Sequence, residues 1–194
     1  MNGDRAGERS GDRGNGMKLY VVRHGETDWN RIDRLQGNHD VPLNEKGLEQ
    51  AHEAREALKD CEYEVVFSSP LVRAADTARI INEEKQKPIF FDPRLRERNF
   101  GSREGMVKGT YNYTELWDYE KNLSYGGESM KVFFERVWDF LDDLKKLPSV
   151  ETVLLVCHGG TMRAIESYFH GIRVAEGMAG FFSKNAEVRT YELN

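Results

Sequence analysis

The stretch that decides the fold is residues 18–27, which read KLYVVRHGET. It begins as an apolar, strand-like run and continues into Arg23 and His24. In α/β proteins, reactive groups gather just beyond the carboxyl ends of strands, where loops open into a crevice. A second apolar run, residues 152–157, is followed in the same way by His158. Two histidines at two strand ends predict one pocket built from distant parts of the chain.

The rest of the chain alternates between strand-like and helix-like patterns, which favours a largely parallel α/β sheet. The expected strands are residues 18–22, 64–67, 89–91, 152–157 and, as an edge strand, 186–193. The expected helices are residues 45–59, 70–82, 113–121, 129–146 and 161–169. We expect a three-layer α/β/α fold whose central sheet is mostly parallel, with one antiparallel edge strand and a small helical cap. The second helix should have Ser69 as its N-cap and Pro70 at its first position.

Residues 1–16 differ in composition from everything after them. Their five glycines lie among alternating acids and bases. This pattern cannot pack a core, so we expect a disordered leader or tag. Residues 17–194 are long enough for one domain with a substantial core, and we expect its cap at about residues 98–128. Cys61 and Cys157 lack metal-type spacing, and reduced thiols in a cytoplasmic protein are a simpler interpretation than a disulfide.

The charge and hydropathy of the chain exclude several classes of partner. The formal net charge is −5, which disfavours general binding to nucleic acid or to anionic membrane surfaces. No apolar run approaches the roughly 20 residues that are needed to span a bilayer. Any bound anion must therefore be held by a local cluster of basic groups.

Such a cluster is expected where the strands end. The first strand leads into Arg23 and His24, the second into the helix that carries Arg73, and the fourth into His158. In a parallel sheet these positions lie along one rim, where two arginines and two histidines can converge. A phosphate or another tetrahedral oxyanion is the natural ligand, because arginine makes bidentate contacts and stays charged. The helix that starts near Thr161 would direct its backbone N–H groups at the same anion.

These residues belong to an ordered series of motifs. The series comprises Arg23-His24-Gly25-Glu26-Thr27 with Asn30, then Gln36-Gly37, Asp40-x-Pro42-Leu43, Gly47-x-x-Gln50-Ala51, Ser68-Ser69-Pro70-Leu71-x-Arg73-Ala74 with Thr77-Ala78, Leu95-x-Glu97 with Gly101, Gly127-Glu128-Ser129 and Val156-Cys157-His158-Gly159-Gly160. In this series, residues 17–194 resemble the histidine phosphatase superfamily, the phosphoglycerate-mutase-like proteins. The resemblance is closer to the small phosphatases than to the glycolytic mutases. An isolated Arg-His-Gly is weak evidence, whereas the whole series is specific.

The resemblance implies a role for each matching residue. His24 would be the nucleophile that takes up the phosphoryl group, and Glu97 would be the proton donor to the leaving oxygen. The groups that would contact the phosphoryl oxygens are Arg23, Arg73, His158, Asn30 and the backbone at Gly160, with Thr27 as a weaker candidate for pocket contact. Cys157 departs from the family, which more often has serine before the second histidine.

Such a mechanism is consistent with the chemistry of these side chains. Transfer to His24 and then to water replaces one difficult step with two easier ones. Arg23, Arg73 and a protonated His158 would stabilise charge on the phosphoryl oxygens without a metal. His24 must be neutral to attack, and the neighbouring positive charges should lower its pKa. Glu97 would act as an acid on the leaving alkoxide and then as a base on water.

The pocket motifs do not separate hydrolases from mutases. Between Glu97 and Ser129 the chain lacks the basic, proline-rich insertion of glycolytic mutases, which favours a phosphomonoester hydrolase acting on a small phosphorylated metabolite. A cofactor-dependent phosphoglycerate mutase stays an alternative, as does a non-catalytic phosphate-binding module, although the latter could dispense with His24. A zinc hydrolase is disfavoured because paired arginines would repel the cation. We therefore expect neither a metal nor another cofactor.

The expected cap leaves specificity open. Its aromatic residues could contact the organic part of the substrate or pack a cap core, and they are Tyr111, Tyr113, Trp117, Tyr119 and Tyr125. Arg103 and Lys108 could add charge for a second anionic group, although loop cations are usually solvated. An ion pair with Arg96 or Arg98 is the competing interpretation of Glu97. The expected partner is a small-molecule phosphate ester, and a homodimer stays an open alternative.

Overall fold

The computed structural model describes residues 16–119, 126–171 and 181–194. Its strands are β1 (Met17–Arg23), β2 (Val65–Ser68), β3 (Ile89–Phe91), β4 (Thr152–Cys157) and β5 (Val188–Leu193). Its α-helices are α1 (Asp28–Arg31), α2 (Glu45–Ala57), α3 (Val72–Ile81), α4 (Tyr113–Leu116), α5 (Met130–Leu144) and α6 (Gly159–His170). Two 3₁₀ helices are η1 (Pro93–Leu95) and η2 (Gly101–Arg103). The expected leader lies outside the described residues, except for Gly16.

The five strands form one sheet in the order β3-β2-β4-β1-β5. Every neighbouring pair is parallel except β1 and β5, so the predicted antiparallel edge strand is confirmed. Arg23 is paired with Cys157 in the register between β1 and β4. These two central strands therefore end at the same level, and the residues that follow them, His24 and His158, are neighbours.

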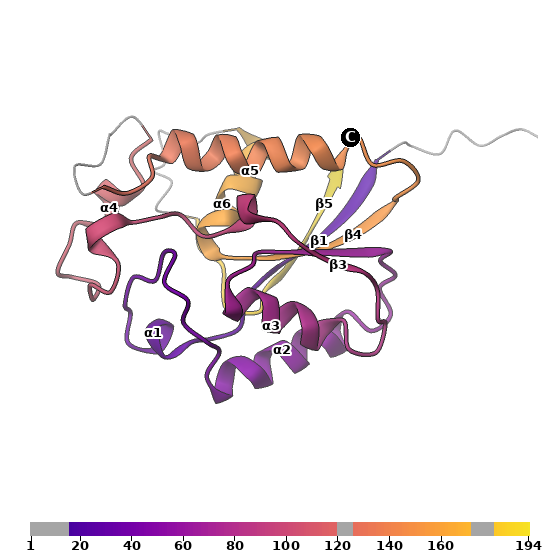
Figure 1. Ribbon diagram of the computed structural model, residues 1–194, viewed down its shortest axis with the longest axis horizontal. Coiled ribbons are helices and arrows are strands. Elements are labelled where there is room, and N and C mark those ends of the chain that lie inside the picture. Colours follow the sequence, from indigo (N-terminus) through magenta and orange to yellow (C-terminus); the bar gives the residue numbers. More distant parts are fainter. Residues whose placement is uncertain (1–15, 120–125, 172–180) are drawn as a thin grey trace, which may run out of the picture.

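Helices cover both faces of the sheet, which confirms the three-layer prediction. Figure 1 shows α5 and α6 on one face and α2 and α3 on the other. Because successive side chains of a strand point to opposite faces, β1 places Leu19 and Val21 in one core and Tyr20 and Val22 in the second. The first core is the larger one, and α5 contributes Phe133, Phe134, Val137, Phe140 and Leu141 to it. Each such burial contributes about 1.5–3 kcal/mol to the free energy of unfolding.

The start of α3 differs from the prediction. The helix begins at Val72, and neither Ser69 nor Pro70 caps it. The carboxylate of Asp40 instead accepts a hydrogen bond from the backbone N–H of Val72 at 2.6 Å. The Ser69 hydroxyl lies 2.7 Å from Nε2 of His158. Asp40, which is distant in sequence, thus accepts the hydrogen bond at the start of α3, and the Ser69 hydroxyl contacts His158 at the end of β4.

The loop after β1 packs backbone against backbone on the start of α2. A Cβ added at Gly25 would lie 2.3 Å from the carbonyl oxygen of Gly47, and one added at Gly47 would lie 2.0 Å from that of Glu26. Only glycine permits this approach at both positions. The backbone N–H of Gly25 also donates to the hydroxyl of Thr77 on α3 at 3.1 Å. The loop that carries His24 is therefore held against both helices.

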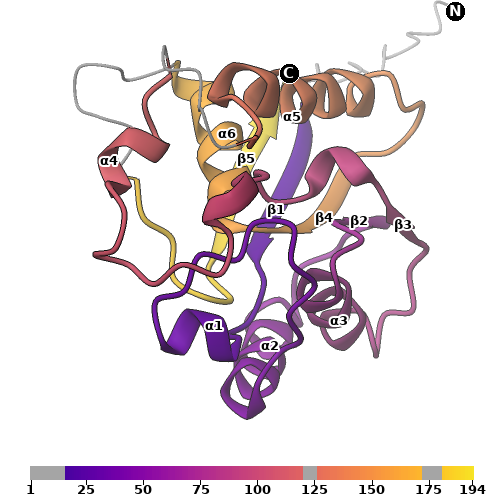
Figure 2. The same cartoon turned by 60° about the vertical axis from the view of Figure 1, so that its left-hand side comes forward.

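The segment between η1 and α5 covers the carboxyl ends of the strands beside α6. We call its described part, residues 98–119 and 126–128, the cap segment. It contains η2 and α4, and Figure 2 shows α4 apart from the helix pair α2 and α3. The helix predicted over residues 113–121 is shorter than expected, since α4 ends at Leu116. Tyr125, which we expected in the cap, lies outside the described residues.

Four further sequence predictions concern the chain as a whole. Cys61 and Cys157 are both free thiols, as predicted. No helix in the described ranges has the length and apolar character required to cross a bilayer. The cytoplasmic location and the homodimer stay predictions.

Candidate active site

His24 is buried at the end of β1, with 3% of its surface exposed. Its Nδ1 lies 2.7 Å from the carbonyl oxygen of Gly25. A carbonyl can only accept, so Nδ1 carries the proton and the neutral ring keeps its lone pair on Nε2. Burial is the main cause that holds the pKa of His24 well below its usual value, followed by the charges of Arg73 and Arg23. The ring is therefore neutral at pH 7, as the sequence predicted.

His158 lies beside His24 as the N-cap residue of α6, with 5.1 Å between the two ring centroids. Its Nε2 is 2.7 Å from the hydroxyl of Ser69, and its buried Nδ1 has no hydrogen-bond partner among the described residues. Burial, and then the charge of Arg73, hold the pKa of His158 well below its usual value. This shift opposes the protonated His158 that we expected beside a phosphoryl group. A phosphoryl dianion would shift the pKa in the opposite direction.

Two arginines flank the histidines and are anchored by backbone carbonyls. Arg73 is fully buried, and it donates to the carbonyl oxygens of His39 at 2.7 Å and Gly37 at 2.8 Å. Burial lowers the pKa of Arg73 to about 10, so the guanidinium stays charged at pH 7. Arg23 donates to the carbonyl oxygen of Ser183. In both arginines the buried Nε has no partner among the described residues.

Asn30 and Thr27 form the start of α1 together, but only Asn30 lines the pocket. The Asn30 Oδ1 accepts hydrogen bonds from the backbone and hydroxyl of Thr27, both at 3.1 Å, and from Asn185 at 3.3 Å. Because Oδ1 is occupied in this way, the Nδ2 donor is left for the pocket. Thr27 is buried and its hydroxyl also contacts Gln36. Thr27 therefore orients Asn30, and it is not placed where we expected a pocket contact.

Glu97 follows η1 in the sequence and lies against the start of α6. Its carboxylate accepts two backbone hydrogen bonds. Oε1 accepts from the N–H of Arg98 at 2.8 Å, and Oε2 accepts from the N–H of Gly160 at 2.9 Å. A Cβ added at Gly160 would lie 2.2 Å from Oε1, so glycine is needed for this approach. The N–H of Gly160, which we expected to face a phosphoryl group, is bonded to the expected proton donor instead.

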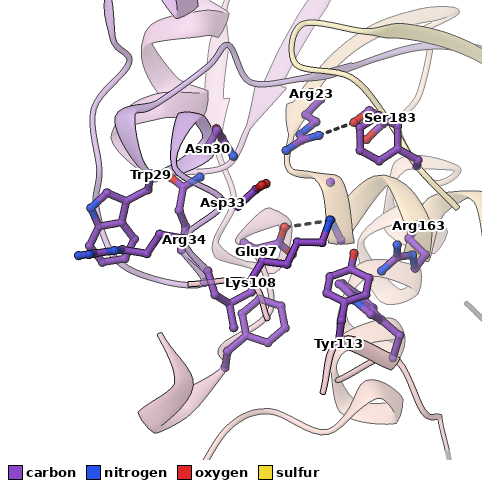
Figure 3. A pocket seen from close by; sticks show the side chains of 18 of the residues that line it. Arg23, Trp29, Asn30, Asp33, Arg34, Glu97, Lys108, Tyr113, Arg163 and Ser183 are labelled. Carbon is purple, nitrogen blue, oxygen red and sulfur yellow. Dashed lines mark hydrogen bonds between the residues drawn. The ribbon is translucent and has the colours of Figure 1, made fainter. Parts of the chain in front are cut away.

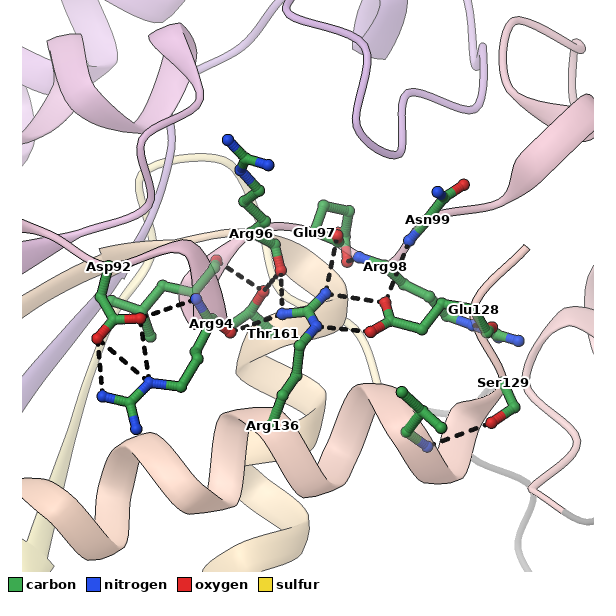
Figure 4. A network of polar contacts seen from close by, with 12 residues as sticks. Asp92, Arg94, Arg96, Glu97, Arg98, Asn99, Glu128, Ser129, Arg136 and Thr161 are labelled. Atoms are coloured by element: carbon green, nitrogen blue, oxygen red, sulfur yellow. Dashed lines mark hydrogen bonds and ion pairs between the residues drawn. The ribbon is translucent and has the colours of Figure 1, made fainter. Parts of the chain in front are cut away.

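A network of polar contacts holds the backbone around Glu97 (Figure 4). From α5, Arg136 donates to the carbonyl oxygens of Arg94 at 2.6 Å, Arg96 at 2.9 Å and Glu97 at 3.1 Å. The same guanidinium is bonded twice to the Glu128 carboxylate, at 2.6 and 2.9 Å. Glu128 stood in a recognised motif, but the sequence carried no signal that linked it to Arg136. One side chain thus binds three backbone carbonyls within residues 94–97, the segment that ends at Glu97.

His24, Arg23 and Arg73 line a pocket of about 340 Å³. Its lining has five cationic side chains and two carboxylates, namely Arg23, Arg34, Arg73, Lys108, Arg163, Asp33 and Glu97. In Figure 3, Arg23 at the end of β1, Lys108 of the cap segment and Arg163 of α6 lie around one space. The excess of positive charge in the lining contrasts with the net negative charge of the chain. The pocket is therefore suited to an anion, as the sequence predicted.

The predicted aromatic residues of the cap divide between the two expected roles. Tyr111, Tyr113 and Trp117 line the pocket, and Trp117 is also part of the larger core. Tyr119 packs on Phe134 of α5, with 6.0 Å between the ring centroids. Of the two cap cations, Lys108 lines the pocket, whereas Arg103 forms an ion pair with Glu115 at 3.5 Å.

Sequence reasoning missed residues outside the motifs that line the pocket or bind the residues that line it. Arg163 lies on α6, four residues after Gly159, so a signal existed in the helical spacing that places the two on one face. Ser183 and Asn185 approach from the segment before β5, through a backbone carbonyl and an amide respectively. No pattern in the sequence marks these last two, because their roles depend on where the chain returns to the sheet.

The described part of the chain offers no metal site. No group of three or more histidine, cysteine, aspartate or glutamate side chains within it could hold an ion. Burial raises the pKa of the Cys157 thiol, which keeps it in the neutral form that binds metals poorly. The two histidines at the strand ends have Arg73 beside them, and its charge would repel a cation.

Comparisons with known proteins agree with this geometry. The sequence profile of the histidine phosphatase superfamily (branch 1) matches residues 19–194. A metal-independent phosphoserine phosphatase of Arabidopsis thaliana is 36% identical over 186 residues, which span 91% of this chain and 76% of the relative. A probable phosphoglycerate mutase, GpmB of Escherichia coli O1:K1, is 36% identical over 168 residues, which span 80% and 76%. The structure of a mycobacterial glucosyl-3-phosphoglycerate phosphatase with VO3 has a TM-score of 0.80 at 29% identity, and the match covers 90% of this chain and 92% of that one.

Proposed function

The chain belongs to branch 1 of the histidine phosphatase superfamily, and from that membership we propose that it hydrolyses phosphomonoesters of small metabolites through a phosphohistidine on His24. The observation that carries this proposal is the hydrogen bond between Nδ1 of His24 and the carbonyl oxygen of Gly25. It leaves Nε2 as the nucleophilic atom of a neutral ring. Arg23 and Arg73 lie beside that ring, and the buried Nε of each has no hydrogen-bond partner in the part of the chain that the structure describes.

In the first step, the Nε2 lone pair of His24 forms a bond to phosphorus while the bond from phosphorus to the ester oxygen breaks. The leaving alkoxide takes a proton from Glu97, which must enter the step protonated. Positive charge appears on the ring, and the carbonyl oxygen of Gly25 stabilises it through the Nδ1 proton. Arg23 and Arg73 stabilise the charge on the equatorial phosphoryl oxygens.

In the second step, the Glu97 carboxylate accepts a proton from water as the water oxygen attacks phosphorus. The bond from phosphorus to Nε2 breaks, inorganic phosphate leaves, and His24 returns to its neutral form. The two hydrogen bonds that Glu97 receives from backbone N–H groups hold the carboxylate in place for both steps. His158 binds the phosphoryl group more strongly once the dianion has raised its pKa.

Release of inorganic phosphate from p-nitrophenyl phosphate, in the presence of EDTA, tests this proposal. The His24→Ala variant should lose at least about 10³-fold in kcat/KM, as expected when a covalent nucleophile is removed. The matched control is His52→Ala, because His52 is an exposed histidine on α2. Full activity in His24→Ala, or complete inhibition of the wild type by EDTA, would contradict the proposal.

A phosphoglycerate mutase is the second candidate, because a relative that bears this name covers 80% of the chain. Stimulation by 2,3-bisphosphoglycerate and conversion between 2- and 3-phosphoglycerate, without release of phosphate, would favour the mutase. Binding of inorganic phosphate without turnover of any ester would favour the non-catalytic module.

A further inference from the structure

Buried side-chain nitrogen atoms that have no hydrogen-bond partner among the described residues form two groups along the pocket, apart from Nε of Arg34, whose guanidinium lies over the Trp29 ring. The first group surrounds His24 and comprises Nε of Arg23, Nε of Arg73 and Nδ1 of His158. The second group lies on the cap side and comprises Nε and Nη1 of Arg163 and Nε1 of Trp117. Both residues of the second group line the pocket. Buried donors rarely lack acceptors in folded proteins, so a second group points to a second part of the ligand.

Arg163 is held so that its N–H groups stay available. The side chain is 4% exposed, and its Cζ lies 3.6 Å from the centroid of the Trp117 ring. This contact occupies the face of the guanidinium and leaves the N–H groups at its edge. Nη2 donates to the carbonyl oxygen of Phe181 at 2.6 Å. No carboxylate in the described ranges forms an ion pair with Arg163, although Glu97 is near enough to raise its pKa.

The hydroxyl of Tyr113 is the polar group that approaches the Arg163 guanidinium from the cap segment (Figure 3). Tyr113 also lies beneath Lys108, whose Nζ is 6.0 Å from the centroid of its ring. Lys108 is exposed, so its charge is screened by solvent, whereas that of Arg163 is not. The buried guanidinium is therefore the stronger electrostatic feature of this wall.

The spacing along α6 sets the distance between the two groups of donors. A Cβ added at Gly159 would lie 3.5 Å from Cζ of Arg23, so that residue marks the side of the first group. Arg163 lies four residues further along the same helix, a rise of about 6 Å. This short spacing allows two anionic groups of one small molecule to reach both places at once.

We propose that Arg163 and Trp117 bind a carboxylate on the organic part of the substrate, so that the substrates are small phosphorylated carboxylic acids. This inference rests on the proposed function, since it names what occupies the far side of the same pocket. A carboxylate matches the site because it carries one charge, like the single buried guanidinium, and can accept from several donors at once. The indole N–H supplies a further donor without adding charge.

Two substrates that differ in one group test this inference. 3-Phosphoglycerate carries a carboxylate where glycerol 3-phosphate carries a hydroxymethyl group, and the two are otherwise alike. The quantity to measure is the ratio of their kcat/KM values, because a ratio within one protein sample does not depend on the fraction that is folded. We expect the wild type to favour 3-phosphoglycerate by at least about tenfold, the size of a charge-assisted hydrogen bond.

The Arg163→Met variant should bring this ratio close to one, and Arg163→Lys should restore part of the preference. The matched control is Arg189→Met, because Arg189 also stacks on an aromatic ring, with 4.4 Å to the centroid of Phe181, but pairs with Glu187 and does not line the pocket. Its ratio should equal that of the wild type. A wild-type ratio near one, or an unchanged ratio in Arg163→Met, would overturn the inference while activity on p-nitrophenyl phosphate upholds the proposed function. Absence of hydrolysis of all three esters would instead reject the proposed function itself.

Discussion

The arginines beside His24 and the arginine on the cap side of the pocket are held in different ways. Arg73 is held by two backbone carbonyls that come from the loop before α2. Arg163 is held chiefly by the face of the Trp117 ring, and Trp117 belongs to the cap segment. The first arrangement depends on the strand ends and their loops, and the second depends on which side chain the cap presents. Chemistry and specificity are thus assigned to parts of the chain that can vary separately.

Apart from the loss of His24, removal of Arg73 should have the largest effect on the strand-end side. We expect Arg73→Met to lower kcat/KM for every phosphomonoester by about 10²–10³-fold, because it stabilises charge that develops on the phosphoryl oxygens. The matched control is Arg79→Met, since Arg79 is on the same helix but pairs with Asp76 at the surface. Steady-state kinetics with p-nitrophenyl phosphate measures both. A loss below about threefold in Arg73→Met would show that the strand ends do not carry the chemistry.

Glu97 is held by backbone N–H groups at the junction of the two regions. The effect of its removal on kcat/KM should depend on the leaving group. We expect Glu97→Gln to lower kcat/KM by about 10²-fold for an alkyl phosphate such as glycerol 3-phosphate. The loss should be much smaller for p-nitrophenyl phosphate, since p-nitrophenolate leaves without a proton. Rates for a series of aryl and alkyl esters give the dependence on the leaving-group pKa. Equal losses across the series would remove Glu97 as the proton donor.

Removal of the Arg136 guanidinium should show the same dependence on the leaving group as Glu97→Gln, with a smaller loss of activity. The hydrogen bonds of Arg136 among the described residues go to backbone carbonyls and to Glu128, and its guanidinium lies over the Phe133 ring, so it acts by positioning Glu97. We expect Arg136→Met to lower kcat for alkyl esters by about tenfold, which is typical of a displaced catalytic group. Arg136→Lys should restore part of the loss, and the matched control is Lys131→Met, an exposed lysine on the same helix. A loss that is uniform over all leaving groups would indicate a general effect on folding instead.

The smallest expected effect concerns acid stability. His24 and His158 both have pKa values well below that of an unfolded histidine, about 6.5. Their neutral forms therefore stabilise the fold above that pH, and this stability is lost as the pH falls below it. We expect the free energy of unfolding to fall less between pH 7 and 5 in a His24→Asn/His158→Gln variant than in the wild type. Urea titrations at the two pH values measure the free energy of unfolding. An equal decrease between pH 7 and 5 in the variant and the wild type would contradict the buried, neutral histidines.

The strand ends could be predicted from the sequence because local patterns determine them. Apolar runs placed His24 and His158 correctly, and the register between β1 and β4 brings them together. The start of α3 could not be predicted, since Ser69 and Pro70 form a good local N-cap signal but Asp40 supplies the bond from a distant loop. Tertiary contact overrides local preference there.

The cap side was largely beyond sequence reasoning. The position of Arg163 on α6 follows from helical spacing, but its contact with Trp117 depends on how the cap segment folds over the helix. The pKa shifts of the two histidines could also be predicted only in part from the sequence. Neighbouring arginines were expected to lower the pKa of His24, yet the same neighbours and the same burial act on His158, which we had expected to be charged.

Direct detection of a phosphohistidine on His24 is the strongest test of the proposed chemistry. The protein would be mixed with p-nitrophenyl phosphate, quenched at alkaline pH, where phosphohistidine survives, and digested for mass spectrometry. We expect one phosphorylated peptide, with the phosphoryl group on His24 and none on His158 or Ser69. A phosphoryl group on either of the other residues, or turnover without any phosphorylated peptide, would contradict His24 as the nucleophile.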